Sequence, residues 1–205
     1  YDPEYLRRAR ALCDRYGVHL IADEIMTGFG RTGSFFAFQQ AGITPDLLCL
    51  SKGITGGYLP LSAVLASDAI YQAFYDDAVT RGFLHSHSYT GNALACRAAL
   101  ATLDIFEEDR VIEANRARAA RISAIARPLA AHPRVSGFRN LGMIWAFEVA
   151  GADAGFAREF FRRALARELL LRPIGNTVYF MPPYVISDDE AALLVRRTVE
   201  IIEQL

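Results

Sequence analysis

The first stretch of the chain places apolar and polar residues at helical spacing. Between residues 5 and 16 apolar side chains recur with the period of an amphipathic helix. Asp2 is a good N-cap, Pro3 a good first helical residue and Gly17 a natural C-terminal glycine. We therefore expect a capped helix at the start of the chain.

Three short apolar runs follow this helix, and none of them alternates with polar residues. They cover residues 18–22, 46–50 and 61–66. Uninterrupted apolar strands separated by loops and helices are typical of a parallel sheet that is buried on both faces. The predicted fold class is therefore α/β, with a mostly parallel sheet in the first part of the chain.

The pattern changes after about residue 108, where shorter paired strands replace the buried runs. Asp68 is expected to cap a helix, and Ser187 with Glu190 has the spacing of a capping box. We predict a larger α/β part, 1–108, and a smaller α+β part, 109–205. Helices are expected near 68–75, 92–107, 110–131, 154–169 and from 187 onward, and strands near 135–139, 143–149, 170–172 and 177–181.

Composition and charge narrow the functional classes. The chain has 205 residues, 52% of them hydrophobic, and a net charge of −1. This balance argues against nucleic acid or an anionic membrane as the main partner. No apolar run reaches the length of a membrane span, and no signal peptide is present. Three widely spaced cysteines indicate buried thiols in a reducing compartment such as the cytoplasm.

The chain begins at Tyr1, without an initiator methionine, and enters a capped helix at once. We expect it to be a piece of a longer protein. Expressed alone, such a piece is expected to lack sheet strands, to expose apolar faces and to aggregate.

One basic residue stands apart from the others. The chain uses arginine or lysine 22 times, and Lys52 is the only lysine. A lysine amine can lose its proton and attack a carbonyl, whereas a guanidinium stays protonated. Genomic bias with one leftover surface lysine is the alternative. The position of Lys52, after an apolar run and before a glycine-rich turn, favours chemistry.

A carboxylate is expected near this amine. Asp23 follows the first apolar run and Lys52 follows the second, and parallel strands place their carboxyl ends along one edge of a sheet. Pyridoxal phosphate requires such a pair, because a lysine binds its aldehyde and an acid keeps its ring nitrogen protonated. The alternative for Asp23 is a loop or helix-cap acid.

Three segments resemble consecutive signatures of the class III aminotransferases, which are pyridoxal-phosphate enzymes of fold type I. The segments are IADEIMTGFGRTG, DLLCLSKGITGGYLPLSA and HSHSYTGNALACRAAL. The resemblance implies that Asp23 faces the pyridine nitrogen and that Lys52 forms the Schiff base with the cofactor. It implies that Ile25 packs on the ring. Ser88 stands where the family usually has a threonine that reaches the phosphate of the neighbouring subunit's cofactor, so a homodimer is implied too.

A fourth segment, LLRPIGNTVYFMPPYVIS, is similar to the branch of this family that aminates 8-amino-7-oxononanoate in biotin synthesis. This resemblance implies small-molecule substrates, with S-adenosylmethionine or lysine as amino donor. Arg172 would hold the substrate carboxylate, a task that suits a planar guanidinium, and Tyr179 would lie nearby. An ordinary surface ion pair is the alternative for Arg172.

Other polar residues of these motifs have structural explanations beside functional ones. Glu24 is expected to orient the following loop, and Arg31 either contacts substrate or binds loop carbonyls. His85 and His87 have no accompanying metal ligands, so no metal is expected and a subunit interface is favoured. The loop glycines and aromatics are expected to be turn and core residues, namely Gly28, Gly30, Gly33, Gly56, Gly57, Phe35, Phe36 and Phe38.

Three further functions compete with the biotin-pathway reaction. The first is another class III transaminase that acts on ω-amino acids or diamines. The second is an inactive, truncated piece, because the family's phosphate loop and ring-stacking aromatic are expected ahead of residue 1. The third is a non-catalytic scaffold, which leaves the lone lysine unexplained.

Overall fold

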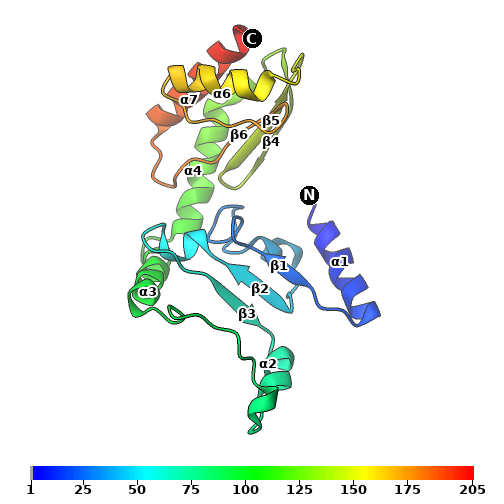
Figure 1. The fold of residues 1–205 in the computed structure, drawn as a ribbon. Helices are drawn as coiled ribbons and strands as arrows, with labels where there is room; N and C mark the ends of the chain where they lie inside the picture. Colours follow the sequence, from blue (N-terminus) through cyan, green and yellow to red (C-terminus); the bar gives the residue numbers. More distant parts are fainter. Residues whose placement is uncertain (1) are drawn as a thin grey trace. The chain divides into compact units, whose positions relative to one another are not determined.

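The computed structural model describes residues 2–205 and divides the chain into two compact units, residues 1–112 and 113–205. Figure 1 shows the elements of both units. Among the described residues no helix is a candidate membrane span.

The first unit contains a three-stranded sheet and three α-helices. The sheet has the order β1-β2-β3, and short 3-10 turns connect its elements. The strands are β1 (Ile21–Asp23), β2 (Leu47–Leu50) and β3 (Ala63–Ala66), the helices α1 (Pro3–Tyr16), α2 (Asp68–Phe74) and α3 (Ala93–Glu108), and the turns η1 (Ala37–Ala41), η2 (Lys52–Thr55) and η3 (Val79–Arg81).

The sheet of the first unit is mixed rather than wholly parallel. Strand β1 runs parallel to β2, and β3 runs antiparallel to β2. The expectation of three parallel strands was therefore wrong for β3. The connection explains this direction: residues 51–62, which join β2 to β3, contain one 3-10 turn and no α-helix, whereas a parallel crossover is usually made by an α-helix.

The sheet is also less buried than its apolar composition predicts. Ile21 is 59% exposed, and Val64 and Leu65 on β3 are 62% and 53% exposed. Burial is concentrated around Phe29, Leu48 and Leu50, against which further aromatic side chains pack. The prediction of a sheet buried on both faces is therefore not met within this unit.

Helix α1 has the predicted caps and is joined to the sheet by an ion pair. The Asp2 side chain accepts the N–H of Glu4, and Gly17 ends the helix with a left-handed φ of 62°. Arg10 donates to Asp46 at 2.6 Å, and Asp46 also accepts the N–H of Leu20 at 2.7 Å. A carboxylate at the start of β2 thus holds the helix next to both parallel strands.

The second unit is built on an antiparallel sheet with the order β4-β5-β6. Helices α6 and α7 lie against this sheet (Figure 1). The strands are β4 (Val135–Leu141), β5 (Ile144–Val149) and β6 (Thr177–Phe180), and the helices α4 (Val111–Ile125), α5 (Arg127–Ala130), α6 (Phe156–Ala166) and α7 (Asp188–Glu203).

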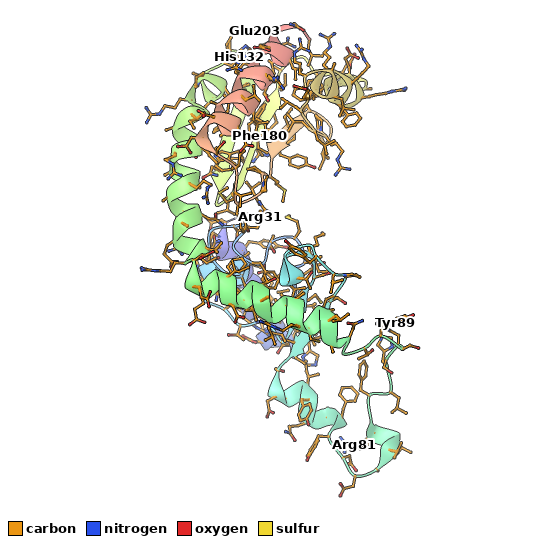
Figure 2. All side chains as sticks on the ribbon, turned by 90° about the vertical axis from the view of Figure 1, so that its left-hand side faces the viewer. Arg31, Arg81, Tyr89, His132, Phe180 and Glu203 are labelled. Atoms are coloured by element: carbon orange, nitrogen blue, oxygen red, sulfur yellow. The ribbon has the colours of Figure 1, made fainter. Side chains whose placement is uncertain are left out.

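Alternate residues of β5 and β6 form the centre of the second core. Trp145 pairs with Phe180 and Phe147 with Val178 across the two strands, and all four are buried. Figure 2 labels Phe180 among the side chains of this unit. The Trp145 indole N–H donates to Ser123 Oγ at 2.9 Å, so its one polar group is satisfied.

Several boundaries differ from the prediction. The helix expected at 110–131 is two helices, α4 and α5, because Pro128 fits the first turn of a new helix better than a helix interior. Residues 170–172 form no strand, and only a single bridge between Ile174 and Thr177 precedes β6. Ser67, rather than Asp68, is the N-cap of α2.

The closing helix agrees with its sequence signature. Ser187 accepts the N–H of Glu190, and the Glu190 carboxylate accepts the N–H of Ser187. These reciprocal bonds make the predicted capping box. The α/β fold class is confirmed, with one mixed and one antiparallel sheet.

Candidate active site

Asp23 is the last residue of β1 and is exposed at the carboxyl end of the strand. Its Oδ1 accepts the backbone N–H of Ile25 at 3.0 Å. Within residues 2–205 its other oxygen has no hydrogen-bond or ion-pair partner. The carboxylate therefore keeps one oxygen available for a ligand.

Lys52 opens the 3-10 turn η2, two positions after β2 ends. Its amine is exposed and has no hydrogen-bond or ion-pair partner in the described part of the chain. Its φ is 46°, in the left-handed region that few non-glycine residues adopt. Such strained residues cluster at functional sites.

The parallel pairing of β1 and β2 brings these two residues to one edge of the sheet. Asp23 lies opposite Cys49 in the register, and the N–H of Glu24 donates to the Cys49 carbonyl at 3.0 Å. Since both strands run in the same direction, Asp23 and Lys52 both leave the sheet at its carboxyl edge.

The turn that carries Lys52 is fixed by short contacts on both sides. Ser51 Oγ donates to the Leu61 carbonyl at 2.9 Å, and the buried Thr55 hydroxyl donates to the Leu59 carbonyl at 2.6 Å. Gly53 lies so close to Phe29 that an added Cβ would be 2.9 Å from the Phe29 Cβ. The turn is therefore packed against the loop that follows Asp23.

Phe29, which packs against Gly53, is a residue that the sequence interpretation missed, as is Gly53. Phe29 is buried and has a φ of 58°, which is unusual for an aromatic residue. Its ring contacts Phe35, Phe36 and Phe106 at centroid distances of 5.4, 5.9 and 6.3 Å. An aromatic residue between two glycines, in the segment GFG, is the signal that could have found it.

The other residues of the loop after Asp23 are partly buried or pack against neighbouring aromatic rings. Ile25 is partly buried next to Asp23, and Arg31 is partly buried on the same loop, where Figure 2 labels it. Phe38 stacks on Phe36 with ring centroids 5.7 Å apart. The aromatics of this loop thus pack among themselves.

A cavity of about 600 Å³ begins beside the lysine turn. The segment between α2 and α3 lines its other side; Figure 2 labels Tyr89 there. Ser88 is exposed, and the neighbours of Ser88, rather than Ser88 itself, line this space. The lining residues are Ser51, Pro60, Leu61, Ser62, His87, Tyr89, Thr90, Gly91 and Asn92.

The two histidines of this segment are held locally. His87 Nδ1 accepts the N–H of Tyr89 at 3.1 Å, and the N–H of His87 donates to the Thr90 hydroxyl at 3.1 Å. The His85 ring lies 5.7 Å from the Phe83 ring. Among the described residues no group of three or more His, Cys, Asp or Glu could hold a metal ion.

Arg172 and Tyr179 belong to the second unit. Arg172 is exposed and, within residues 2–205, has no hydrogen-bond or ion-pair partner, so the surface ion pair considered for it is absent there. Tyr179 pairs with Ala146 and therefore points to the sheet face opposite Phe180 and the core.

The second unit also has an apolar groove of about 420 Å³, which is lined by Leu171 and Phe180 but not by Arg172 or Tyr179. Leu170 and Val185 on its rim are strongly exposed. Glu190 is the one charged residue of the lining, and it is already engaged in the capping box. The lining consists of Leu169, Leu170, Leu171, Phe180, Met181, Pro182, Pro183, Val185, Ile186, Glu190, Leu193 and Leu194.

Comparison with known proteins identifies the family. Residues 1–202 match the family described as aminotransferase class-III. The chain belongs to this family.

Individual relatives and a solved structure agree with the family. An adenosylmethionine-8-amino-7-oxononanoate aminotransferase from Helicobacter pylori is 50% identical over 100% of this chain and 48% of its own length. An omega-aminotransferase from Caulobacter vibrioides is 36% identical over 98% of this chain and 47% of its own length. The crystal structure of adenosylmethionine-8-amino-7-oxononanoate aminotransferase from Methanocaldococcus jannaschii has 35% identity and a TM-score of 0.84, covering 94% of this chain and 47% of that one. The chain spans about half the length of the relatives it matches.

Proposed function

We propose that the protein carrying this chain is a pyridoxal-phosphate-dependent aminotransferase that transfers an amino group to 8-amino-7-oxononanoate in biotin biosynthesis. The observation that carries the proposal is the position of Asp23 and Lys52 at the carboxyl edge of two parallel strands. The similarity to relatives named for this reaction supports the choice of substrate.

The residues present fit pyridoxal phosphate. The Lys52 amine has no competing partner in residues 2–205, and Asp23 keeps one carboxylate oxygen available. Lys52 would hold the cofactor through its aldehyde carbon, and Asp23 would face the ring nitrogen. Ile25 would pack on the ring, and Ser88 would reach the phosphate held by a neighbouring subunit.

The chemistry divides between the cofactor and the chain. Bound pyridoxal phosphate supplies an electron-withdrawing ring that acidifies the α-carbon of an amine substrate. The Lys52 amine would act there as general base and general acid, accepting the proton of the substrate's α-carbon and donating it again. The Asp23 carboxylate would keep the ring nitrogen protonated through a charge-assisted hydrogen bond.

Substrate recognition is assigned to three residues. Arg172 would bind a substrate carboxylate with its planar fork of donors, for which a guanidinium that is exposed and has no partner in residues 2–205 is suited. Tyr179 and Arg31 would contact the remainder of the substrate. We also propose that 1–108 belong to the cofactor-binding large domain and 109–205 to the small domain.

The assembly and cellular location are part of the same proposal. A homodimer follows from the role given to Ser88, because the phosphate it would contact belongs to the other subunit. A cytoplasmic location fits the three free cysteines, Cys13, Cys49 and Cys96.

An absorbance spectrum tests the cofactor assignment. The complete protein that carries this chain, mixed with pyridoxal phosphate, is expected to show a visible Schiff-base band that Lys52→Ala abolishes. Lys52→Arg is the matched control, because it keeps the charge but offers no reactive amine at neutral pH. A parent protein without the band would refute the proposal.

Product analysis separates the leading function from its alternative. Diamine formation from 8-amino-7-oxononanoate with S-adenosylmethionine or lysine supports the biotin-pathway reaction. Turnover that depends on pyruvate or 2-oxoglutarate would favour an ω-amino acid or diamine transaminase instead, a reading supported by the similarity to the omega-aminotransferase. The same assays on the 205-residue chain alone would decide whether it is inactive by itself.

A further inference from the structure

Glu24 is a buried carboxylate that directly follows Asp23. Only 3% of its surface is exposed. Its Oε1 accepts the backbone N–H of Phe38 at 2.8 Å, and its Oε2 accepts the Thr27 hydroxyl at 2.5 Å. Within residues 2–205 no cationic side chain forms an ion pair with it.

Such an arrangement does not favour stability by itself. A buried carboxylate held only by neutral donors carries a desolvation cost that a cation would offset. An apolar side chain of similar volume often serves a purely structural site as well or better. The charge at Glu24 therefore calls for a role other than packing.

The hydrogen bonds of Glu24 close the chain reversal that follows Asp23. The Glu24 N–H donates to Cys49 on β2, and its carbonyl accepts the N–H of Gly28 at 2.9 Å. An added Cβ on Gly28 would lie 2.8 Å from that carbonyl oxygen, so the turn is as tight as glycine allows. Asp23 Oδ1 accepts the Ile25 N–H inside the same turn, and the direction of its carboxylate depends on this turn.

The loop that Glu24 holds by hydrogen bonds also contacts the turn that carries Lys52. Phe29 lies between the two segments that Glu24 joins, Thr27 and Phe38, and it packs against Gly53, the residue after Lys52. Both Phe29 and Lys52 have left-handed φ values, 58° and 46°. Strained conformations persist only where their surroundings hold them, and the fastened loop supplies that hold on one side of the lysine turn.

We propose that Glu24 is a positioning residue, which fixes the loop of residues 27–38 so that Asp23 and Lys52 meet the cofactor in the correct geometry. This inference rests on the proposed function. Glu24 touches neither substrate nor cofactor in this role and acts through Thr27, Phe38 and the Phe29–Gly53 contact.

Cofactor affinity tests the proposal in the complete protein that carries this chain. Glu24→Met keeps the buried volume but accepts no hydrogen bond, and Glu24→Gln keeps an acceptor for Phe38. We expect Glu24→Met to raise the dissociation constant of pyridoxal phosphate roughly 10- to 100-fold, the range typical when residues that orient a ligand group are lost. Glu24→Gln should restore most of the affinity.

The matched control is Gln40, whose side chain also holds this loop by hydrogen bonds. Gln40 donates to the Thr32 carbonyl, the Thr32 hydroxyl and the Ser34 hydroxyl, far along the loop from the turn at Asp23. Gln40→Ala should lower the melting temperature without changing cofactor affinity. If Gln40→Ala weakens binding as much as Glu24→Met does, general loosening of the loop explains the effect and the proposal is overturned.

A second readout needs no cofactor. In the cofactor-free protein, Glu24→Met should speed hydrogen exchange at the amides of Gly28 and Phe38, and Gln40→Ala should leave the Gly28 amide unchanged. If Glu24→Met does not fold, Thr27→Val removes one of the two bonds and should weaken binding in the same direction.

The outcomes separate the two proposals. A parent that binds pyridoxal phosphate together with a folded Glu24→Met of equal affinity would overturn the role of Glu24 and leave the proposed function intact. A parent without any Schiff-base band would overturn the proposed function and this inference together.

Discussion

The two units of the chain bury their apolar residues to very different degrees. In the second unit both β5 and β6 turn alternate residues into one core, and Trp145, Phe147 and Phe180 are almost fully buried. In the first unit a buried cluster surrounds Phe29, Leu48 and Leu50, while Val64 on β3 is 62% exposed. The candidate chemistry lies in the unit with the smaller core.

This difference shows that the core of the second unit and the candidate site of the first unit are stabilised by different interactions. The second unit is stabilised by side-chain burial, for which area removed from water is the main favourable term. The site in the first unit is held by hydrogen bonds and close backbone contacts around Glu24, Gly28 and Gly53. Substitutions should therefore act on the two units through different mechanisms.

The largest effect is expected from the core of the second unit. Phe160→Ala removes a ring that is 0% exposed and should lower the free energy of unfolding of this unit by ~3–5 kcal/mol. Denaturation followed by the fluorescence of Trp145, the only tryptophan, measures it. Val64→Ala in the first unit is the counterpart and should change stability by less than ~0.5 kcal/mol. Equal losses would contradict the comparison.

A smaller effect is expected at the lysine turn of the first unit. In Gly53→Ala the new Cβ would lie 2.9 Å from the Phe29 Cβ, and such overpacking costs ~1–3 kcal/mol. Hydrogen exchange at the β2 amides would record the loss. Gly155→Ala in the second unit is the control, because its Cβ would meet only the Asp153 carboxylate at 3.3 Å. Protection of β2 that survives in Gly53→Ala would argue against a tight Phe29–Gly53 contact.

Ser187 and Ser67, the serine N-caps of the α-helices α7 and α2, offer a matched pair with a smaller expected difference. Ser187 accepts the N–H of Glu190 in a capping box, whereas Ser67 caps α2 without a side-chain hydrogen bond. Ser187→Ala should cost ~1 kcal/mol, and Ser67→Ala close to nothing. Urea denaturation of both variants beside the parent tests this, and equal costs would count against the cap geometry.

The smallest expected effect is a difference in how the stability of the two units depends on pH. The Arg10 guanidinium, helped by the Leu20 N–H, lowers the pKa of Asp46 below its ordinary value. Stability from Asp46 is therefore present above the unfolded-state pKa and is lost as pH falls through the lower folded-state pKa. We expect α1 to detach from the sheet in this range, with Asp46→Asn showing no such pH dependence.

The second unit should respond to acid only locally. Arg162 and Arg163 lower the pKa of Glu159 to about 2, but all three lie on the same helix. Protonation of Glu159 should weaken one face of α6 without loosening the core around Trp145. Circular dichroism and Trp145 fluorescence, recorded between pH 5 and pH 2, would separate the two responses. A change in fluorescence at the pH where α1 is lost would contradict this division.

The sequence predicted local features of the fold better than its long-range ones. The caps Asp2, Gly17 and Ser187 depend on neighbours a few residues away, and all three took the expected form. The direction of β3 depends on its pairing with β2, and an apolar run does not reveal that. The exposure of Val64 likewise depends on which elements pack on the strand.

The candidate site shows the same limit. The strand-end positions of Asp23 and Lys52 were predictable because each follows an apolar run, and the parallel pair brings them to one edge. The hydrogen bond from the Phe38 N–H to Glu24 joins residues that are 14 positions apart. No periodic pattern in the sequence predicts such a bond. Phe29 and Gly53 were missed because a contact between two loops involves single residues and produces no repeating pattern in the sequence.

The left-handed conformation of Lys52 sets a limit on how this chain could be engineered for heat resistance. At an exposed position such as Arg110, with a φ of 45°, replacement by glycine relieves the steric penalty of the backbone. The same replacement at residue 52 would remove the amine to which the proposed function assigns the cofactor. A thermostabilised version that keeps the proposed function must therefore keep that local strain and gain its stability at other positions.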